Sequence, residues 1–474
     1  ESAAQDRLAA LGYRDPRGAM RHIQALTSGV SRRAEIQRHL MPVLLGWFAD
    51  GVDADAGLLG FRIVSESLGT TSWYLRMLRD SPAAAERLCH ILSSSRYITD
   101  LLEDAPTSIT WLDKVADLQP LGAAALKAEI ASLLSRHDDS AEAMRAVRYL
   151  RRREILRIAM GDALNLLGVQ QVCTGLATVD ECTIGAALAL AEREEITAKE
   201  REEAAGIREI PEEEPENPLL TEITVIAMGR LGGAENGFGS DADVMFVHRP
   251  VEGAGEDEAQ PQANRIVNRL MQLIKQPVRP AIRAERPLEV DADLRPEGKQ
   301  GAMVRSLDSY RAYYERWAET WEFQALLRAR PIAGSEELGR AFIELIDPYR
   351  YPREFTAEQA QQVRRMKARV EHERMPHGAD RTRQLKLGRG GLSDVEWLVQ
   401  LIQLQHAHKV EGLRTTSTLE ALDAAVQAKL VAAEDVEVLR DAWLLATKIR
   451  GGNVLRGVRQ SDLLPTLRDA LEAV

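Results

Sequence analysis

Two aspartates separated by a single residue follow a glycine-rich stretch near the middle of the chain. Residues 227–248 read AMGRLGGAENGFGSDADVMFVH, with five glycines ahead of Asp241 and Asp243. Because side chains alternate between the faces of a strand, a strand that begins here would present both carboxylates on one side. Carboxylates held so close repel each other unless a cation lies between them, and Mg²⁺ prefers oxygen ligands. Taken alone, the pattern fits either a metal site or the ordinary start of a strand.

A second pair of aspartates makes the metal site the stronger hypothesis. The stretch EVDADLRPEGKQG places Asp291 and Asp293 on one face of a predicted strand, with Arg295 and Lys299 just beyond. A carboxylate from this strand could complete a metal site and accept the proton of an attacking hydroxyl. Enzymes that transfer phosphoryl-type groups often hold two metal ions about 3.5–4 Å apart. We therefore expect carboxylates from two strands to bind Mg²⁺, as two ions.

The glycines supply what a phosphate group needs beside such a metal site. Glycine permits sharp bends and lets backbone N–H groups approach phosphate oxygens closely. Arg230 adds a cation and Ser240 a hydroxyl donor. The stretch is neither a P-loop nor a dinucleotide fingerprint, because the spacings of both differ. Farther along, KLGRGGLSDVEW at residues 386–397 predicts either a plain helix N-terminus or a second anion-binding edge of the site.

Hydrophobic patterning indicates which elements position these residues. EITVIAM, DVMFVH and PLEVDADL have the alternation or β-branched content of strands, and NRIVNRLMQLIKQPV has a helical period. We expect EGAGEDEAQPQ, at 252–262, to be a flexible acidic connection. The predicted fold is mostly α, with one α/β domain flanked by helical domains. The expected divisions are a helical region at 1–191, an acidic proline-containing linker at 192–218, a catalytic α/β domain at 219–345, and a helical domain at 346–474 that is truncated within a helix.

Composition excludes several classes of function. The net charge of −11 argues against a nucleic-acid partner, since a surface that follows phosphates needs a basic excess. Three cysteines without a C-x-x-C pair argue against a disulfide framework and fit a cytoplasmic protein. No uninterrupted apolar run approaches the roughly 18 residues of a membrane span, so we expect no membrane partner. EHERMPH does not predict a zinc site, because His372 and His377 are wrongly spaced and Pro376 intervenes.

Four motifs in a fixed order carry a family resemblance. They are VIAMGRLGGAENGFGSDADVMFVH, LEVDADLRPEGKQG, YYERWAETWEFQALLRARPIAG and LKLGRGGLSDVEWLVQL. In this order they resemble the glutamine synthetase adenylyltransferase family, and actinobacterial members most of all. That family has two homologous nucleotidyltransferase halves of the DNA polymerase β type, and this chain resembles the C-terminal, adenylylating half with the central helical region before it. The resemblance implies transfer of AMP from ATP to a tyrosine hydroxyl of glutamine synthetase, with release of pyrophosphate.

The resemblance also implies roles for individual residues. Asp241 and Asp243 match the metal-binding pair, and Asp291 matches the third aspartate of a V-D-x-R-L-R-P motif. Asp293 stands where the family commonly has arginine. The residues implied to bind the nucleotide are Gly229, Arg230, Gly232, Gly233, Ser240, Arg295, Lys299, Lys386 and Arg389.

Other functions remain open at this point. The same fold could run the reverse chemistry and remove AMP from tyrosine with phosphate, because both directions use the same carboxylates. The chain could instead be a non-catalytic module that binds glutamine synthetase or a PII-type signal protein, although the intact aspartates speak against that. An RNA-terminal nucleotidyltransferase is disfavoured by the acidic net charge.

Overall fold

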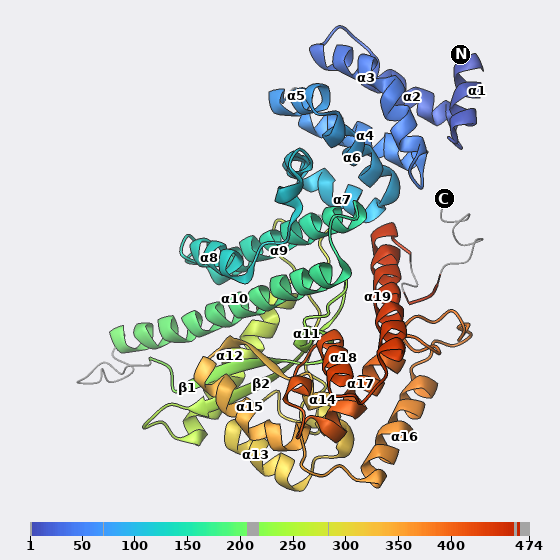
Figure 1. Cartoon of the computed structure of the whole chain (residues 1–474). Coiled ribbons are helices and arrows are strands. Elements are labelled where there is room, and N and C mark those ends of the chain that lie inside the picture. Colours follow the sequence, from blue (N-terminus) through green and yellow to red (C-terminus); the bar gives the residue numbers. More distant parts are fainter. Residues whose placement is uncertain (1, 70, 206–217, 283, 459–461, 465–474) are drawn as a thin grey trace.

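The computed structural model describes residues 2–69, 71–205, 218–282, 284–458 and 462–464. Helices predominate, and one small mixed sheet lies between an N-terminal and a C-terminal group of helices (Figure 1). This confirms the expectation of a mostly helical chain with one α/β unit. Figure 1 also shows the last long helix rising beside the sheet toward the N-terminal group, so the two helical groups meet next to the α/β unit.

The N-terminal group consists of short helices packed on one apolar core. The helices are α1 (Ser2–Leu11), α2 (Pro16–Thr27), α3 (Arg32–Ala49), α4 (Ala54–Leu68), α5 (Ser72–Asp80), α6 (Pro82–Ser94), α7 (Arg96–Asp104) and α8 (Ala123–Leu134), with 3₁₀ turns at Pro106–Leu112 and Val115–Leu118. Side chains at helix starts satisfy free N–H groups: Asp53 accepts from Ala56 at 2.9 Å, and Ser95 from Ile98 at 3.2 Å. Phe48 and Phe61 pack edge to face inside this core.

Two long helices, α9 (Ser140–Ala163) and α10 (Val169–Ala204), connect this group to the sheet. Among the residues that the structure describes, α10 is the one helix long and apolar enough to cross a membrane, although the sequence shows no uninterrupted apolar run of that length. In its most apolar window 72% of the residues are buried inside the protein, where α10 packs on α9, α8 and the sheet. It has the burial of a core helix.

The expected start of the acidic linker at residue 192 is wrong, because α10 continues to Ala204. Two of its acidic residues form ion pairs with a neighbouring helix, α12 (Glu256–Lys275): Arg269 meets Glu194 at 2.7 Å and Arg265 meets Glu195 at 2.8 Å. Opposite charges across two helices remove the repulsion that the sequence suggested. The proline-containing part of the linker, at 206–217, lies outside the described residues.

The sheet has a central antiparallel pair. Its strands are β1 (Thr221–Ala227), β2 (Ala242–Pro250), β3 (Val290–Asp291), β4 (Val304–Ser306) and β5 (Arg330–Gly334). Their order is β3-β2-β1-β5, and β4 also pairs with β2; the β2–β3 and β2–β4 pairs are parallel. The two strands predicted around the glycine-rich stretch are confirmed. The third is much shorter than predicted and ends at Asp291.

Each face of the sheet has its own core. Val225 and Val244 lie in the core shared with α10 and α12, whereas Ile226 and Met245 lie in a separate core with α13 (Leu307–Arg316) and α15 (Glu336–Arg350). The predicted flexible acidic connection at 252–262 is wrong, because α12 begins at Glu256. Three acidic residues occupy its first turn, where the partial positive charge of a helix N-terminus stabilises them.

The C-terminal helices pack on a separate core of their own. They are α14 (Thr320–Leu326), α16 (Ala357–Glu373), α17 (Leu392–His406), α18 (Thr418–Gln427) and α19 (Ala433–Arg456). Buried Trp443, on α19, packs there with α17 and α18. The end of α19 also reaches the N-terminal group, where Ser95 Oγ donates to the Leu455 carbonyl at 2.7 Å. Helices from both ends of the chain thus converge beside the glycine-rich stretch.

Candidate active site

Parallel pairing of β2 and β3 puts two of the predicted aspartates side by side. Asp243 and Asp291 are register partners, and Asp241 lies immediately before β2. Ala242, between the two aspartates of the first pair, is fully buried in the core. Asp293 lies beyond the end of β3: its backbone N–H donates to Asp291 Oδ1 at 2.7 Å, and its carboxylate pairs with Lys299 at 3.3 Å. The structure thus gathers the first three carboxylates and turns the fourth away.

Burial and the neighbouring carboxylates together raise the pKa of one member of the cluster. Burial, and then the negative charges of Asp291 and Asp241, raise the pKa of Asp243 to about 6, against the opposing pull of Lys386 and Arg374. A cation placed among these carboxylates would relieve that repulsion. Among the described residues, no three His, Cys, Asp or Glu side chains already form a closed set of metal ligands. The site fits an ion such as Mg²⁺, which commonly takes one or two carboxylates and completes its shell with substrate phosphates.

The first part of the glycine-rich stretch is packed tightly into the protein. It contains the single-turn helix α11 (Gly229–Gly232). At Gly229, whose φ is +52°, any side chain would collide with Asp243 Oδ2. A Cβ on Gly232 would overlap the Arg328 carbonyl, and one on Gly233 the Arg328 guanidinium. The N–H groups of these last two glycines donate to carbonyls of residues 228 and 229, so both N–H groups already have partners within the protein.

Two polar residues that the sequence did not single out hold this part in place. Glu235 is buried, and it accepts from the Thr418 N–H at 2.6 Å and from Arg328 at 2.9 Å. Asn236 is also buried and donates to Asp180 of α10 at 2.9 Å. Their partners lie far away in the sequence, so no local pattern could have revealed them. Together they tie the stretch to both helical groups.

The second part of the stretch lines a cavity of about 400 Å³ next to α19. The cavity is basic, because three arginines reach it from three different segments and its lining, within the part of the chain that the structure describes, includes no carboxylate. Two of these arginines also form ion pairs, Arg230 with Glu396 and Arg450 with Asp462. Its lining residues are Arg230, Gly237, Phe238, Gly239, Ser240, Arg286, Thr447, Arg450, Gly451, Val454, Gly457 and Val458. Arg230 and Ser240 were predicted from the sequence; Arg286, Thr447 and Arg450 were not.

Several polar atoms at this cavity lack a partner within the protein. Among the described residues, buried Arg230 Nη2 and Thr447 Oγ1 make no hydrogen bond. Ser240 Oγ accepts from the Gly237 N–H at 2.9 Å, which leaves its proton to donate. An unsatisfied buried polar group costs about 1–3 kcal/mol. A ligand with several acceptor oxygens would satisfy these groups together, as the phosphates of a nucleotide would.

Of the four remaining predicted residues, Arg295 is buried, and three are exposed: Lys299, Lys386 and Arg389. Arg295 is buried and donates to the carbonyls of Gly301 at 3.0 Å and Ala292 at 2.8 Å, so it closes the turn after β3 and does not line the cavity. Lys299 is exposed and pairs with Asp293. Lys386 is exposed and close enough to Asp243 to lower the pKa of that carboxyl. Arg389 is exposed in the loop leading to α17.

Clustered carboxylates lie beside a basic cavity on a small sheet between helical groups, an arrangement suited to binding phosphate groups and a cation. The sequence model of glutamate-ammonia ligase adenylyltransferase matches residues 85–345, and that of PII-uridylyltransferase matches residues 364–473. The first match covers more than half of the chain, which therefore belongs to the glutamate-ammonia ligase adenylyltransferase family.

Curated relatives agree with this family. The chain is 49% identical over its whole length to a bifunctional glutamine synthetase adenylyltransferase/adenylyl-removing enzyme of Streptomyces avermitilis, of which it covers 47%. It is 46% identical to the enzyme of that name from Mycobacterium tuberculosis, covering 46% of it. With that of Corynebacterium glutamicum it shares 45% identity, over 98% of this chain and 43% of the relative. The chain spans about half the length of these relatives.

Proposed function

We propose that this chain transfers AMP from ATP to a tyrosine hydroxyl of glutamine synthetase in the cytoplasm, releasing pyrophosphate and thereby down-regulating nitrogen assimilation. We further propose that residues 219–345 are a Mg²⁺-dependent nucleotidyltransferase domain of the DNA polymerase β type. The observation that carries the proposal is the pairing of Asp243 with Asp291, one loop away from a basic cavity with unsatisfied donors. Family membership supplies the substrate.

In this reaction the chain's residues would bind the phosphates of ATP, neutralise their charge and orient the reacting groups. Arg230, Arg286 and Arg450, with the Ser240 hydroxyl, would hold phosphate oxygens on the cavity side. Asp241, Asp243 and Asp291 would hold Mg²⁺, which neutralises charge on the phosphates when bound. A carboxylate at this edge would accept the proton of the attacking tyrosine hydroxyl. Most of the rate enhancement would come from positioning and electrostatics.

An assay with labelled ATP distinguishes the addition of AMP to glutamine synthetase from its removal. The chain is incubated with Mg²⁺, ATP labelled at the α-phosphate and unmodified actinobacterial glutamine synthetase, and we expect label on a tyrosine of that protein. The D241N/D243N double variant is the matched control, and chelation of Mg²⁺ should also stop transfer. Label lost from pre-adenylylated glutamine synthetase upon addition of phosphate, without transfer in the forward assay, would instead identify an adenylyl-removing enzyme, an activity that the relatives' name includes.

A non-catalytic role makes a different prediction. A module that only binds glutamine synthetase or a PII-type signal protein would transfer no label in either direction. We propose a PII-type protein as a possible additional partner, on the ground that a PII-uridylyltransferase model matches the C-terminal helices. Co-sedimentation of the chain with a PII-type protein, with and without ATP, tests this separately from catalysis.

A further inference from the structure

One arginine of the basic cavity is held from the opposite side by the N-terminal helices. Arg286 lines the basic cavity and also a small enclosed cavity of about 40 Å³ between residues 237–241 and the N-terminal helices. On that second side, its guanidinium carbon lies 4.4 Å from the centre of the Tyr97 ring. Tyr97 belongs to α7, far earlier in the chain. A cation over an aromatic face at this distance is an attractive contact.

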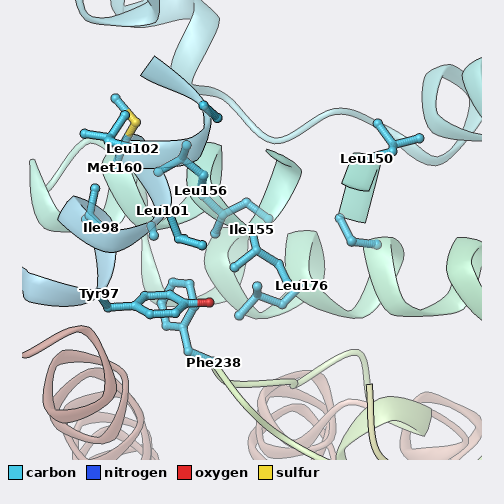
Figure 2. Packing of buried hydrophobic residues seen from close by; sticks show 14 of the residues in the cluster. Tyr97, Ile98, Leu101, Leu102, Leu150, Ile155, Leu156, Met160, Leu176 and Phe238 are labelled. Atoms are coloured by element: carbon cyan, nitrogen blue, oxygen red, sulfur yellow. The ribbon is translucent and has the colours of Figure 1, made fainter. Parts of the chain in front are cut away.

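The platform on which Arg286 rests is rigid. Figure 2 shows Tyr97 in an apolar cluster with Ile98, Leu101, Ile155, Leu176 and Phe238, the last from the glycine-rich stretch. Tyr97 is only 8% exposed, so its ring is fixed by packing. The backbone nearby is fixed as well, because Arg151 donates to the Arg286 carbonyl at 2.7 Å and to Asp180 at 2.8 Å.

The Arg286 side chain itself is exposed. An exposed arginine has many rotamers, and ordering it on binding a ligand costs free energy. Stacking on a fixed ring removes part of that cost beforehand. We propose that Tyr97 is a positioning residue for polyphosphate binding: it holds Arg286 over the basic cavity, so that the N-terminal helices form one side of the triphosphate site. This inference rests on the proposed function for the identity of the ligand as a nucleoside triphosphate.

The test measures binding apart from catalysis. The dissociation constants of inorganic tripolyphosphate and of ATP are measured by calorimetry on the full chain. We expect Y97L to weaken both roughly 3- to 10-fold, the range of a partly buried cation–π contact, and Y97F, which keeps the ring, to restore wild-type binding. In AMP transfer, Y97L should raise the KM for ATP and change kcat less than about twofold. Tyr74→Leu, which removes a buried ring elsewhere in the N-terminal group, is the matched control and should leave tripolyphosphate binding unchanged.

A double-mutant comparison separates positioning from general packing. If Tyr97 acts through Arg286, Y97L should have no effect on tripolyphosphate binding in an R286A background. An equal effect of Y97L with and without the arginine, or equal loss in Y97F and Y97L, would overturn the inference. Tripolyphosphate binding that follows this pattern while no AMP reaches glutamine synthetase would refute the proposed function and leave the positioning role standing.

Discussion

The two parts of the glycine-rich stretch contrast sharply, although both are rich in glycine. Residues 229–236, the anchored part, are buried among partners from α10 and α18, and their glycines are required by close packing against Arg328 and Asp243. Residues 237–243, the open part, line the basic cavity and lead to the carboxylates. Phe238 is the exception in the open part, since its ring is buried in the core of the N-terminal group.

The contrast shows how a loop can be rigid and still accessible. In the anchored part, the Glu235 carboxylate and the Asn236 side-chain NH2 have partners within the protein, so these groups hold the stretch in place. At the basic cavity, Thr447 Oγ1 on α19 and Nη2 of Arg230, which reaches the cavity from the anchored part, have no partner among the described residues. Free energy gained by anchoring the stretch can thus offset the cost of leaving polar groups unsatisfied at the cavity. Substitutions should therefore separate stability from activity along one short segment.

The largest expected effect is on activity, at the end of the open part. D243N removes a carboxylate that we propose binds Mg²⁺ and keeps the shape of the side chain, so AMP transfer should fall on the order of 10³-fold or more. The fold should remain, because burial and the negative charges of Asp291 and Asp241 disfavour the ionised Asp243 carboxylate in the wild type. The neutral amide of the variant avoids that cost. Labelled-ATP turnover and a denaturation curve measure the two properties. Turnover near the wild-type rate would remove Asp243 from the metal site.

The raised pKa of Asp243 gives this variant a pH signature. An acid whose pKa rises on folding, here from 3.8 to about 6, costs stability while ionised, and this cost disappears as the pH falls through that interval. D243N should thus be about 1–2 kcal/mol more stable than wild type near pH 7.5, and the difference should vanish near pH 4. At low Mg²⁺, wild-type activity should decline below about pH 6, and more Mg²⁺ should move that midpoint lower, because proton and cation compete. A midpoint insensitive to Mg²⁺ would contradict this.

The next largest effect is on stability, in the anchored part. Gly232→Ala forces a Cβ onto the Arg328 carbonyl, so it should lower the free energy of unfolding by about 3 kcal/mol or more. The matched change in the open part is Gly237→Ala, whose nearest neighbour would be Ser240 Oγ at 3.5 Å, an ordinary contact. It should change stability by less than about 1 kcal/mol. Equal losses, measured by urea denaturation, would erase the distinction between the two parts.

A smaller effect is expected at the hydroxyl of Ser240, which lines the basic cavity and directly precedes Asp241. Ser240→Ala removes the hydroxyl that we propose donates to the triphosphate. It should raise the KM for ATP about 10- to 100-fold, the range for a hydrogen bond to a charged group. The melting temperature should hardly change, since the side chain's hydrogen bond within the protein is to the neighbouring Gly237 N–H. A large fall in melting temperature would assign Ser240 to the anchored part instead.

The smallest effect is expected at Thr447, which lines the basic cavity from α19. Thr447→Val replaces a buried hydroxyl that has no partner among the described residues by a methyl group of similar size. It should stabilise the protein by about 1 kcal/mol and weaken ATP binding only about 2- to 5-fold. Calorimetry with ATP, set against tripolyphosphate, would locate the contact: weakening of ATP alone places the hydroxyl near the nucleoside.

The sequence by itself determined the elements with a strong local signal. β1 and β2 were predictable because short runs of β-branched and apolar residues occur there. The four residues Asp241, Asp243, Asp291 and Asp293 stood out by their spacing. Local signals misled where the deciding partner was distant. Acidic residues at 192–204 suggested a linker, yet they are helical, and α12 supplies arginines that pair with Glu194 and Glu195. The acidic stretch before residue 264 begins that same helix.

Only the tertiary structure decided which carboxylates meet and which basic groups surround the cavity. The parallel register of β2 and β3 chose Asp291 over Asp293, because a strand that ends one residue earlier or later changes which side chain reaches its neighbour. Arg286, Arg450 and Thr447 come from segments that no motif connects to the glycines. Their convergence depends on helices from both ends of the chain packing on one loop, and such long-range packing leaves no periodic mark in the sequence.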